Sequence, residues 1–264
     1  MQSYATFHSQ GWKGLVAPNW RAQLEPLQEW LRQNPGDVLV QLPNREVRRI
    51  STPQGILYVK RLNAGGSLGG VKGTFTDLKW LVRPSRAKAI LRISQALLDA
   101  GFHCPVPVLA ARRRSPWGWP RDVFISIECA GTPITELLPD MPPEERNRVL
   151  SSVACELSRF HREGFIHGDC IPGNIARAPD GRIIFFDHDR TVRRSNRAIL
   201  QHQQRRNLVQ FGFRLSKYLK TLDPFEHFLA DYARDHWESS KAALETARIM
   251  PLVEKRLGSK HRNA

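Results

Sequence analysis

The chain has 264 residues, of which 41% are hydrophobic and 25% charged, a balance that is typical of a globular protein and argues against a disordered chain. Forty Lys and Arg stand against 25 Asp and Glu, so the formal net charge is +15 and the expected partner is anionic. Nucleic acid, a phospholipid surface, a phosphorylated sugar lipid and a nucleotide all meet that condition, so charge does not choose among them.

Cysteine usage and the absence of targeting patterns bear on the compartment. Four cysteines stand singly, without the paired spacing of a disulfide framework or a zinc site: Cys104, Cys129, Cys155 and Cys170. The first residues lack the basic region and apolar core of a secretion signal, and no apolar run reaches membrane-spanning length. We therefore expect a cytoplasmic protein, for which contact with a membrane surface stays open.

The first 130 residues predict a small lobe rich in antiparallel strands. Apolar residues at helical spacing indicate a short helix over 20–32, within an N-terminal extension that covers residues 1–34. A second helix is expected over 85–100, and the glycine-rich segment 63–73 between these elements predicts a flexible basic loop or a solvated connector. The expected strands are 38–42, 46–50, 56–60, 108–112 and 123–129.

Beyond Gly131 the pattern becomes mainly helical. A long helix is expected over 142–163, and helical spacing returns from about residue 196 to the end of the chain. The expected short apolar segments between these helices, bounded by turn residues, are 165–167, 174–176 and 183–186.

Polar residues of catalytic type gather in residues 165–190, FIHGDCIPGNIARAPDGRIIFFDHDR. The segment has an acid at Asp169, an amide five residues later at Asn174, and a second acid at Asp187 after an apolar strand. Phosphoryl transfer uses such a set, because one carboxylate orients the acceptor hydroxyl and takes its proton, while an amide oxygen and another carboxylate hold Mg²⁺ at the nucleotide phosphates. The segment therefore predicts a kinase that uses ATP and Mg²⁺.

The same segment resembles the catalytic and metal-binding loops of protein-kinase-like enzymes. The resemblance rests on His167, Gly168, Asp169, Asn174, Asp187, His188, Asp189 and Arg190. Gly168 stands where typical protein kinases carry Arg, and both this change and the DHDR ending resemble small-molecule and lipopolysaccharide kinases. Residues 85–110 are similar to the N-lobe helix and following strand of bacterial lipopolysaccharide core kinases, which phosphorylate heptose or Kdo sugars.

This resemblance implies an α+β fold with two lobes, of the protein-kinase-like type. The small antiparallel β-rich N-lobe would span residues 35–130, and the larger helical C-lobe residues 131–264. The implied activity is ATP-dependent, in-line phosphorylation of a heptose or Kdo sugar. The implied partner is an anionic sugar lipid at the cytoplasmic face of the inner membrane, and the oligomeric state stays open.

The resemblance also assigns roles to single residues. Asp169 would be the catalytic base, Asn174 and Asp187 would bind Mg²⁺, and Lys60 would hold the α- and β-phosphates. Backbone groups from Glu128 to Ala130 would meet the adenine edge. Further candidates for substrate contact or support of the loop are His167, Asp189, Arg190, Arg193 and Arg194. Of these, His167 is expected to support the loop by hydrogen bonding, and Asp189 either to aid metal or substrate binding or to cap the following loop.

Two features of typical kinases are missing. The connection at 42–45 has no glycine to cover the phosphates, and the helix over 85–100 has no acid where a partner for Lys60 is expected, Ser94 standing near that place. These missing features leave open a non-catalytic pseudokinase that binds nucleotide or an assembly partner. A small-molecule kinase of the aminoglycoside or choline type also stays open, because it would use the same residues with a different acceptor pocket. Nucleic acid is not the expected partner, because nucleic-acid binding is supported by the charge alone and no nucleic-acid-binding motif is present.

Overall fold

A computed structural model describes residues 3–63 and 83–261, and the chain divides into two compact units, Met1–Cys129 and Ala130–Ala264. Of the glycine-rich segment 63–73, all but Asn63 lies outside the described residues. Strands dominate the first unit and helices the second, as the sequence predicts.

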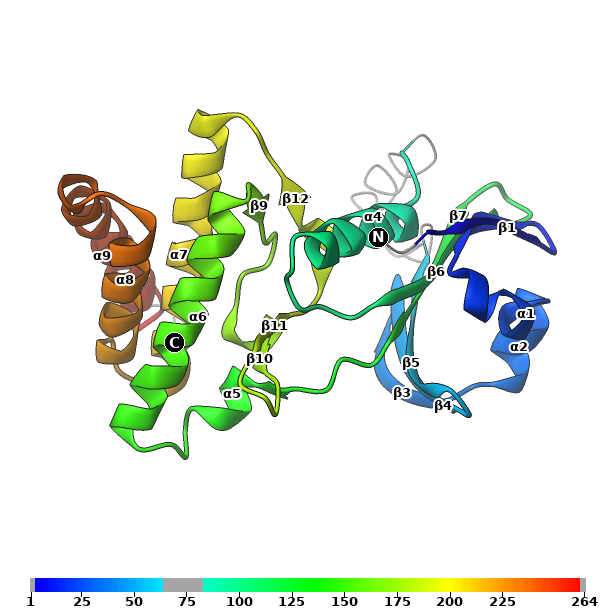
Figure 1. Cartoon of the computed structure of the whole chain (residues 1–264), viewed down its shortest axis with the longest axis horizontal. Coiled ribbons are helices and arrows are strands. Elements are labelled where there is room, and N and C mark those ends of the chain that lie inside the picture. The colour runs from blue at the N-terminus through cyan, green and yellow to red at the C-terminus, as the bar shows by residue number, and fades with distance from the viewer. Residues whose placement is uncertain (1–2, 64–82, 262–264) are drawn as a thin grey trace. The chain divides into compact units, whose positions relative to one another are not determined.

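An antiparallel sheet organises the N-terminal unit (Figure 1). In the described residues its strands follow the order β1-β2-β6-β7-β5-β4-β3. They are β1 Ala5–Ser9, β2 Trp12–Val16, β3 Asp37–Leu42, β4 Arg45–Thr52, β5 Gly55–Asn63, β6 Pro107–Arg114 and β7 Pro120–Ile127. The predicted meander is confirmed in β3, β4 and β5, and the two later strands extend the same sheet.

The first 34 residues contain more structure than the single helix expected there. Strands β1 and β2 pair with each other and, through β2, with β6, so they belong to the sheet of the N-terminal unit. The helical stretch is divided into a 3₁₀ turn η1 Pro18–Trp20, α1 Arg21–Leu24 and α2 Leu27–Gln33. Pro26 explains the division, because proline has no N–H to donate within a helix and its ring clashes with the preceding turn.

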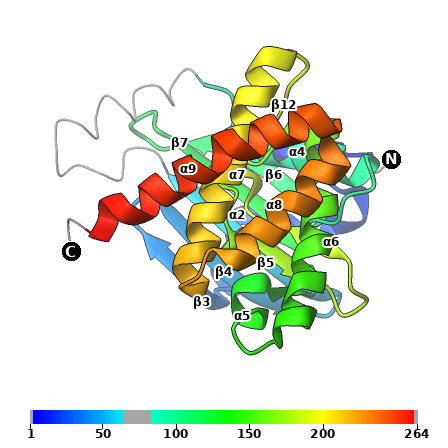
Figure 2. The ribbon, with the colours of Figure 1, turned by 90° about the vertical axis from the view of Figure 1, so that its left-hand side faces the viewer.

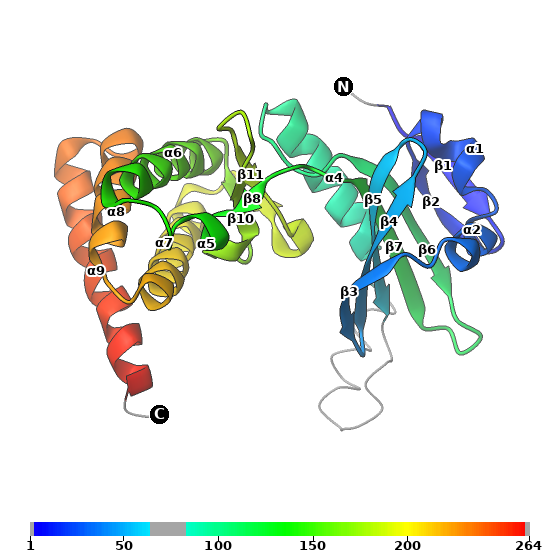
Figure 3. The same cartoon turned by 90° about the horizontal axis from the view of Figure 1, so that it is seen from below.

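Helices cover both faces of this sheet, with α4 Arg86–Asp99 on one side and α1 and α2 on the other (Figure 3). Side chains alternate between the faces along a strand. In β5, Leu57 and Val59 join the core beneath α1 and α2, whereas Leu62 joins the core beneath α4. By the same alternation Arg61 lies on the α2 face and Lys60 on the α4 face.

The C-terminal unit is built on four long helices within the described residues. They are α6 Pro143–Arg162, α7 Arg197–Leu219, α8 Asp223–His236 and α9 Ser239–His261, preceded by the short α5 Ile134–Leu137. Helix α6 packs against α8, and α9 lies across α7 and α8 (Figure 2). Arg205 of α7 pairs with Glu245 of α9 at 2.8 Å, which fixes these two helices to each other.

Short strands and turns interrupt the helices between α6 and α7. They are β9 Phe165–Ile166, the turn η2 Pro172–Asn174, β10 Ile175–Arg177, β11 Ile183–Phe185, the turn η3 His188–Arg190 and β12 Val192–Arg193. Strands β10 and β11 form the predicted hairpin, which β8 Thr132–Pro133 extends, and β12 returns to pair with β9. This pairing closes residues 165–193 into a compact loop assembly. Across the described residues, membrane-spanning length and apolarity do not occur together in any helix.

Candidate active site

Phe186 ties the two halves of the loop assembly together. Its carbonyl accepts a hydrogen bond from Nε2 of His167 at 2.7 Å, and its N–H donates to the carbonyl of Asn174 at 2.9 Å. The residue directly before Asp187 is therefore held by both ends of the segment that carries Asp169. This backbone arrangement fixes the position of Asp187 relative to that segment.

His167 is buried and both of its ring nitrogens are used within the loop. Because Nε2 donates to a carbonyl, Nδ1 carries no proton and accepts the N–H of Asp169 at 3.2 Å. Burial lowers the pKa of this imidazole, which favours the neutral ring that the two hydrogen bonds require. The geometry agrees with the expected supporting role, which stays a prediction.

Asp169 is held by hydrogen bonds that leave one carboxylate oxygen available. Its Oδ1 accepts from Nε2 of Gln210 at 2.5 Å, and its backbone carbonyl accepts from Nδ2 of Asn174 at 2.9 Å. Its Oδ2 has no hydrogen-bond partner among the described residues. An oxygen of this kind is suited to accept the proton of a hydroxyl group.

Asp187 has left-handed backbone geometry, with φ 57° and ψ 63°. This conformation is uncommon for a residue with a side chain, and such positions are frequent at functional sites. The turn η3 begins directly after it. Within that turn His188 is buried, and its Nε2 donates to the carbonyl of Phe185 at 2.9 Å, while Asp189 is partly exposed.

Gly168 is required by close packing against the turn η3. A Cβ at this position would lie 2.1 Å from Cβ and 2.3 Å from the carbonyl oxygen of Arg190, distances that real Cβ atoms do not show. The position is therefore closed to the arginine that typical protein kinases carry. The departure noted in the sequence has a local steric cause.

A buried polar network supports the loop from three helices. Asn207 of α7 accepts the N–H of His167 at 3.1 Å and donates to its carbonyl at 2.6 Å. The same amide oxygen lies 3.1 Å from Nε2 of His161, whose Nδ1 lies 2.7 Å from the hydroxyl of Tyr232. His161 is fully buried, and burial lowers its pKa to about 3, so the ring is neutral and Nδ1 accepts from the tyrosine.

A small basic cavity of about 180 Å³ lies beside the loop within the C-terminal unit. Its lining includes Gly168, the arginines 190, 194 and 206, and the glutamines 203 and 210. Arg193 does not line it: this guanidinium donates to the carbonyl of Glu163 at 3.0 Å and stacks over the ring of Phe165. Of the three arginines proposed from the sequence for substrate contact, two therefore face this cavity.

The oxygen atoms near the loop suit a magnesium ion. Because Nδ2 of Asn174 donates to a carbonyl, its Oδ1 is the atom left to face a metal, and the carboxylate of Asp187 supplies a second hard oxygen. Mg²⁺ prefers such oxygens and commonly takes only one or two protein ligands, with phosphates and water completing the octahedron. Among the described residues, no group of three or more His, Cys, Asp and Glu could hold a metal by itself.

The residues proposed for nucleotide contact lie at or before the boundary between the units. Lys60 lies in β5 on the sheet face that α4 covers, and the acid of α4 is Asp99, its last residue. The Glu128 carboxylate accepts from Tyr58 at 3.3 Å and also pairs with an arginine, and its N–H donates to the carbonyl of Ile56. Ala130 begins the second unit.

Sequence reasoning missed the polar residues that α7 contributes. They recur at helical spacing, at 203, 206, 207 and 210, and so occupy one face of the helix. Polar residues on a helix usually mark its solvated side. The spacing was a usable signal, but only the position of β9 and of the loop identifies this face as the one turned inward.

Two comparisons with known proteins bear on the family and the fold of this chain. The model of the lipopolysaccharide kinase (Kdo/WaaP) family matches residues 31–232. A solved structure described as WaaP in complex with acyl carrier protein superposes with a TM-score of 0.68 at 17% identity, covering 97% of this chain and 98% of that one. No curated protein sequence matches.

The structural likeness confirms the expected α+β, two-lobed protein-kinase-like fold, and the family match confirms a kinase with an alcohol group as acceptor and implies the use of ATP. The family places this kinase in lipopolysaccharide biosynthesis. The chain belongs to the lipopolysaccharide kinase (Kdo/WaaP) family.

Proposed function

We propose that this kinase transfers the γ-phosphate of ATP to a hydroxyl group of a heptose or Kdo sugar of the lipopolysaccharide core. The observation that carries the proposal is the geometry of Asp169: one carboxylate oxygen is fixed by Gln210 and the other is left to accept a proton. In-line attack by the sugar hydroxyl on the γ-phosphate needs a group of this kind and no covalent enzyme intermediate.

Each remaining residue has a separate part in this proposal. Asn174 and Asp187 would bind Mg²⁺, which when bound neutralises charge on the phosphates. Lys60 would hold the α- and β-phosphates. Since the N–H of Glu128 is already used, an adenine contact there would come from its carbonyl, and a second contact from the backbone of Ala130. In the same proposal the kinase lobes span residues 35–130 and 131–264.

The acceptor would enter from the side of the basic cavity. Its arginines 190, 194 and 206 could attract the phosphates or carboxylates of core sugars, since guanidinium groups bind such anions through paired hydrogen bonds. A substrate attached to lipid places the reaction at the cytoplasmic face of the inner membrane, where ATP is present. Asp189 would orient the acceptor or the metal from its place in η3.

A transfer assay with labelled ATP tests this proposal. The acceptors are dephosphorylated core oligosaccharides ending in heptose or in Kdo, an aminoglycoside, choline and a generic protein. We expect label on a core sugar, and mass spectrometry of the product identifies the hydroxyl. Label on the aminoglycoside or choline alone would assign the alternative class, and an inactive chain that still binds ATP would support a pseudokinase.

A further inference from the structure

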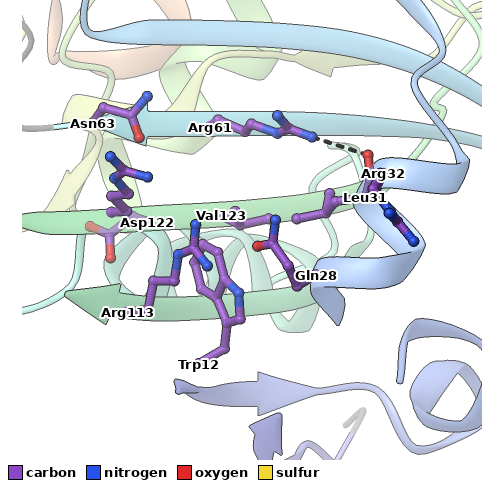
Figure 4. Close-up of a pocket in the computed structure, with 10 residues that line it drawn as sticks. Trp12, Gln28, Leu31, Arg32, Arg61, Asn63, Arg113, Asp122 and Val123 are labelled. Carbon is purple, nitrogen blue, oxygen red and sulfur yellow. Dashed lines mark hydrogen bonds between the residues drawn. The ribbon is translucent and has the colours of Figure 1, made fainter. Parts of the chain in front are cut away.

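A second basic cavity lies entirely within the N-terminal unit. It has a volume of about 320 Å³ and opens beside α2, at the ends of the neighbouring strands β6, β7 and β5 (Figure 4). The residues that matter for its chemistry are Trp12, Arg32, Arg61, Arg113 and Arg121. Lys60, whose side chain lies on the opposite face of the sheet, does not line it, so this cavity is separate from the proposed phosphate contact of ATP.

Strand register brings three of these arginines into one layer. On the α2 face, β5 runs from Leu57 and Val59 to Arg61, and β6 and β7 likewise change from buried apolar residues to Arg113 and Arg121. Arg113 stands directly opposite Arg121, and Val123 stands opposite Arg61. The apolar core beneath α2 therefore ends in a cluster of guanidinium groups.

The cluster carries more positive charge than its neighbours neutralise. Arg32 pairs with Glu29 at 2.6 Å, and Arg61 with Glu46 at 3.4 Å. Neither Arg113 nor Arg121 has a carboxylate partner in the part of the chain that the structure describes.

Asp122 also lines the cavity, but its carboxylate is used in hydrogen bonds on the other face of the sheet. Asp122 is buried, forms two 2.8 Å hydrogen bonds with Arg112, and accepts from Ser85 and the N–H of Arg86. Like charges directly opposite each other in a sheet are destabilising. Burial together with the charges of Arg121 and Arg61 lowers the pKa of Arg113, as expected for crowded cations.

Two buried donors of this cavity have no acceptor. Nε1 of Trp12 and Nε of Arg61 lack hydrogen-bond partners within the described residues, and the tryptophan side chain is only 3% exposed. Arg113 lies over the tryptophan ring, 4.8 Å from its centre, while the terminal nitrogen of Arg61 reaches the carbonyl of Leu31 (Figure 4). Buried donors without a hydrogen-bond partner are rare in native proteins. A bound ligand that accepts hydrogen bonds would explain them here.

We propose that this cavity binds a phosphate monoester. A phosphate group offers three terminal oxygens and a double negative charge to guanidinium and indole donors that have no acceptor of their own. The apolar wall formed by Leu31, Val123 and the indole leaves space for the organic part of the ester. The site goes beyond phosphoryl transfer and does not depend on the acceptor sugar proposed above.

Calorimetry with the full chain tests the site, in an Asp169→Asn background that prevents turnover. The probes are inorganic phosphate, glucose 6-phosphate, and phosphatidylcholine vesicles containing 10 mol% phosphatidic acid, all at one ionic strength. We expect Arg113→Gln and Arg121→Gln each to weaken the binding of inorganic phosphate at least tenfold, and Trp12→Phe to weaken it about threefold.

Arg21→Gln is the matched control, since it removes the same charge from an exposed position of the same unit outside the cavity. Equal affinity in all variants would overturn the site, because the binding of phosphate would then not depend on Arg113 or Arg121. Tighter binding of glucose 6-phosphate than of vesicles assigns a free sugar phosphate, and the reverse order a lipid headgroup, provided that each depends on Arg113. Circular dichroism of every variant separates lost binding from lost folding.

Discussion

The loop assembly of residues 165–193 and the arginine cavity are both polar and partly buried, yet their hydrogen bonding differs. Around the loop, His167, Asn207 and His161 use all their polar side-chain atoms, in hydrogen bonds with one another, with backbone groups or with the hydroxyl of Tyr232. In the cavity, Trp12 and Arg61 each keep a buried donor without an acceptor. A network with every polar atom paired holds the side chains of the loop in place, whereas a surplus of donors indicates a place for an external anion.

The largest expected effect is the loss of the proton acceptor. Asp169→Asn keeps an oxygen for the hydrogen bond from Gln210 but cannot take a proton, so we expect kcat to fall by roughly 10³-fold. Steady-state transfer assays measure this, and ATP binding should persist. Asp180→Asn, in the exposed turn of the β10–β11 hairpin, is the control. Retained turnover in Asp169→Asn would remove this residue from the mechanism.

Removing the centre of the buried network should destabilise the fold. Asn207→Leu deprives the N–H and carbonyl of His167 of their partners, which we expect to lower the free energy of unfolding by about 3 kcal/mol. Urea unfolding measures the change. Gln201→Leu, at an exposed position of α7, should have little effect. An equal loss in both variants would contradict the role of the network.

Acid should weaken the same network through His161. The unfolded chain protonates this histidine near pH 6.5, whereas the folded protein keeps it neutral down to a pKa of about 3. The stabilisation that comes from keeping His161 neutral is therefore fully present above pH 6.5 and is lost as the pH falls. We expect the free energy of unfolding to decrease by about 2 kcal/mol between pH 7 and pH 5 for this reason. His161→Gln should remove that part of the pH dependence in urea unfolding, while the exposed control His202→Gln retains it.

A smaller kinetic effect is expected at Gln210, which positions Asp169. Gln210→Leu removes the hydrogen bond to Oδ1, and we expect kcat to fall about tenfold, equal to about 1.4 kcal/mol, with KM for ATP unchanged. The split between kcat and KM distinguishes positioning from general damage to the fold. A rise in KM for ATP with constant kcat would point to a different role.

The smallest expected effect has the opposite sign. Because Arg121 opposes Arg113 across the sheet, Arg121→Gln should raise the free energy of unfolding by ~0.5 kcal/mol in phosphate-free buffer. High salt screens such repulsion, so the gain should disappear near 1 M salt. The control Arg21→Gln, which breaks a pair with Glu25, should give no gain. A loss of stability in Arg121→Gln would mean that groups of the protein itself already neutralise the arginines of the cavity.

The parts of the molecule that could be predicted are those in which the order of residues along the chain determines the chemistry. The spacing of Asp169, Asn174 and Asp187 was sufficient to predict phosphoryl transfer. Gln210 and Asn207 were not predicted, because polar residues on a helix resemble a solvated surface until the packing of α7 is known.

The arginine cavity was beyond the reach of sequence reasoning for a different reason. In the sequence, Arg61 is far from Arg113 and Arg121, and all three resemble part of a general basic surface. They come together only through the order and register of β5, β6 and β7. Strands β1 and β2 were missed because five residues on each side of a turn give little periodicity. Contacts made across a sheet are set by pairing partners that no local pattern specifies.

The tight contact between Gly168 and Arg190 also bears on how this enzyme can be controlled. Many protein kinases are switched on when arginine side chains bind the phosphate of a phosphorylated activation loop, which orders the loop for catalysis. At position 168 even a methyl group would collide with the backbone of η3, so an arginine cannot be accommodated there without moving that turn. This enzyme therefore cannot be switched on by a phosphorylated loop that binds an arginine at position 168.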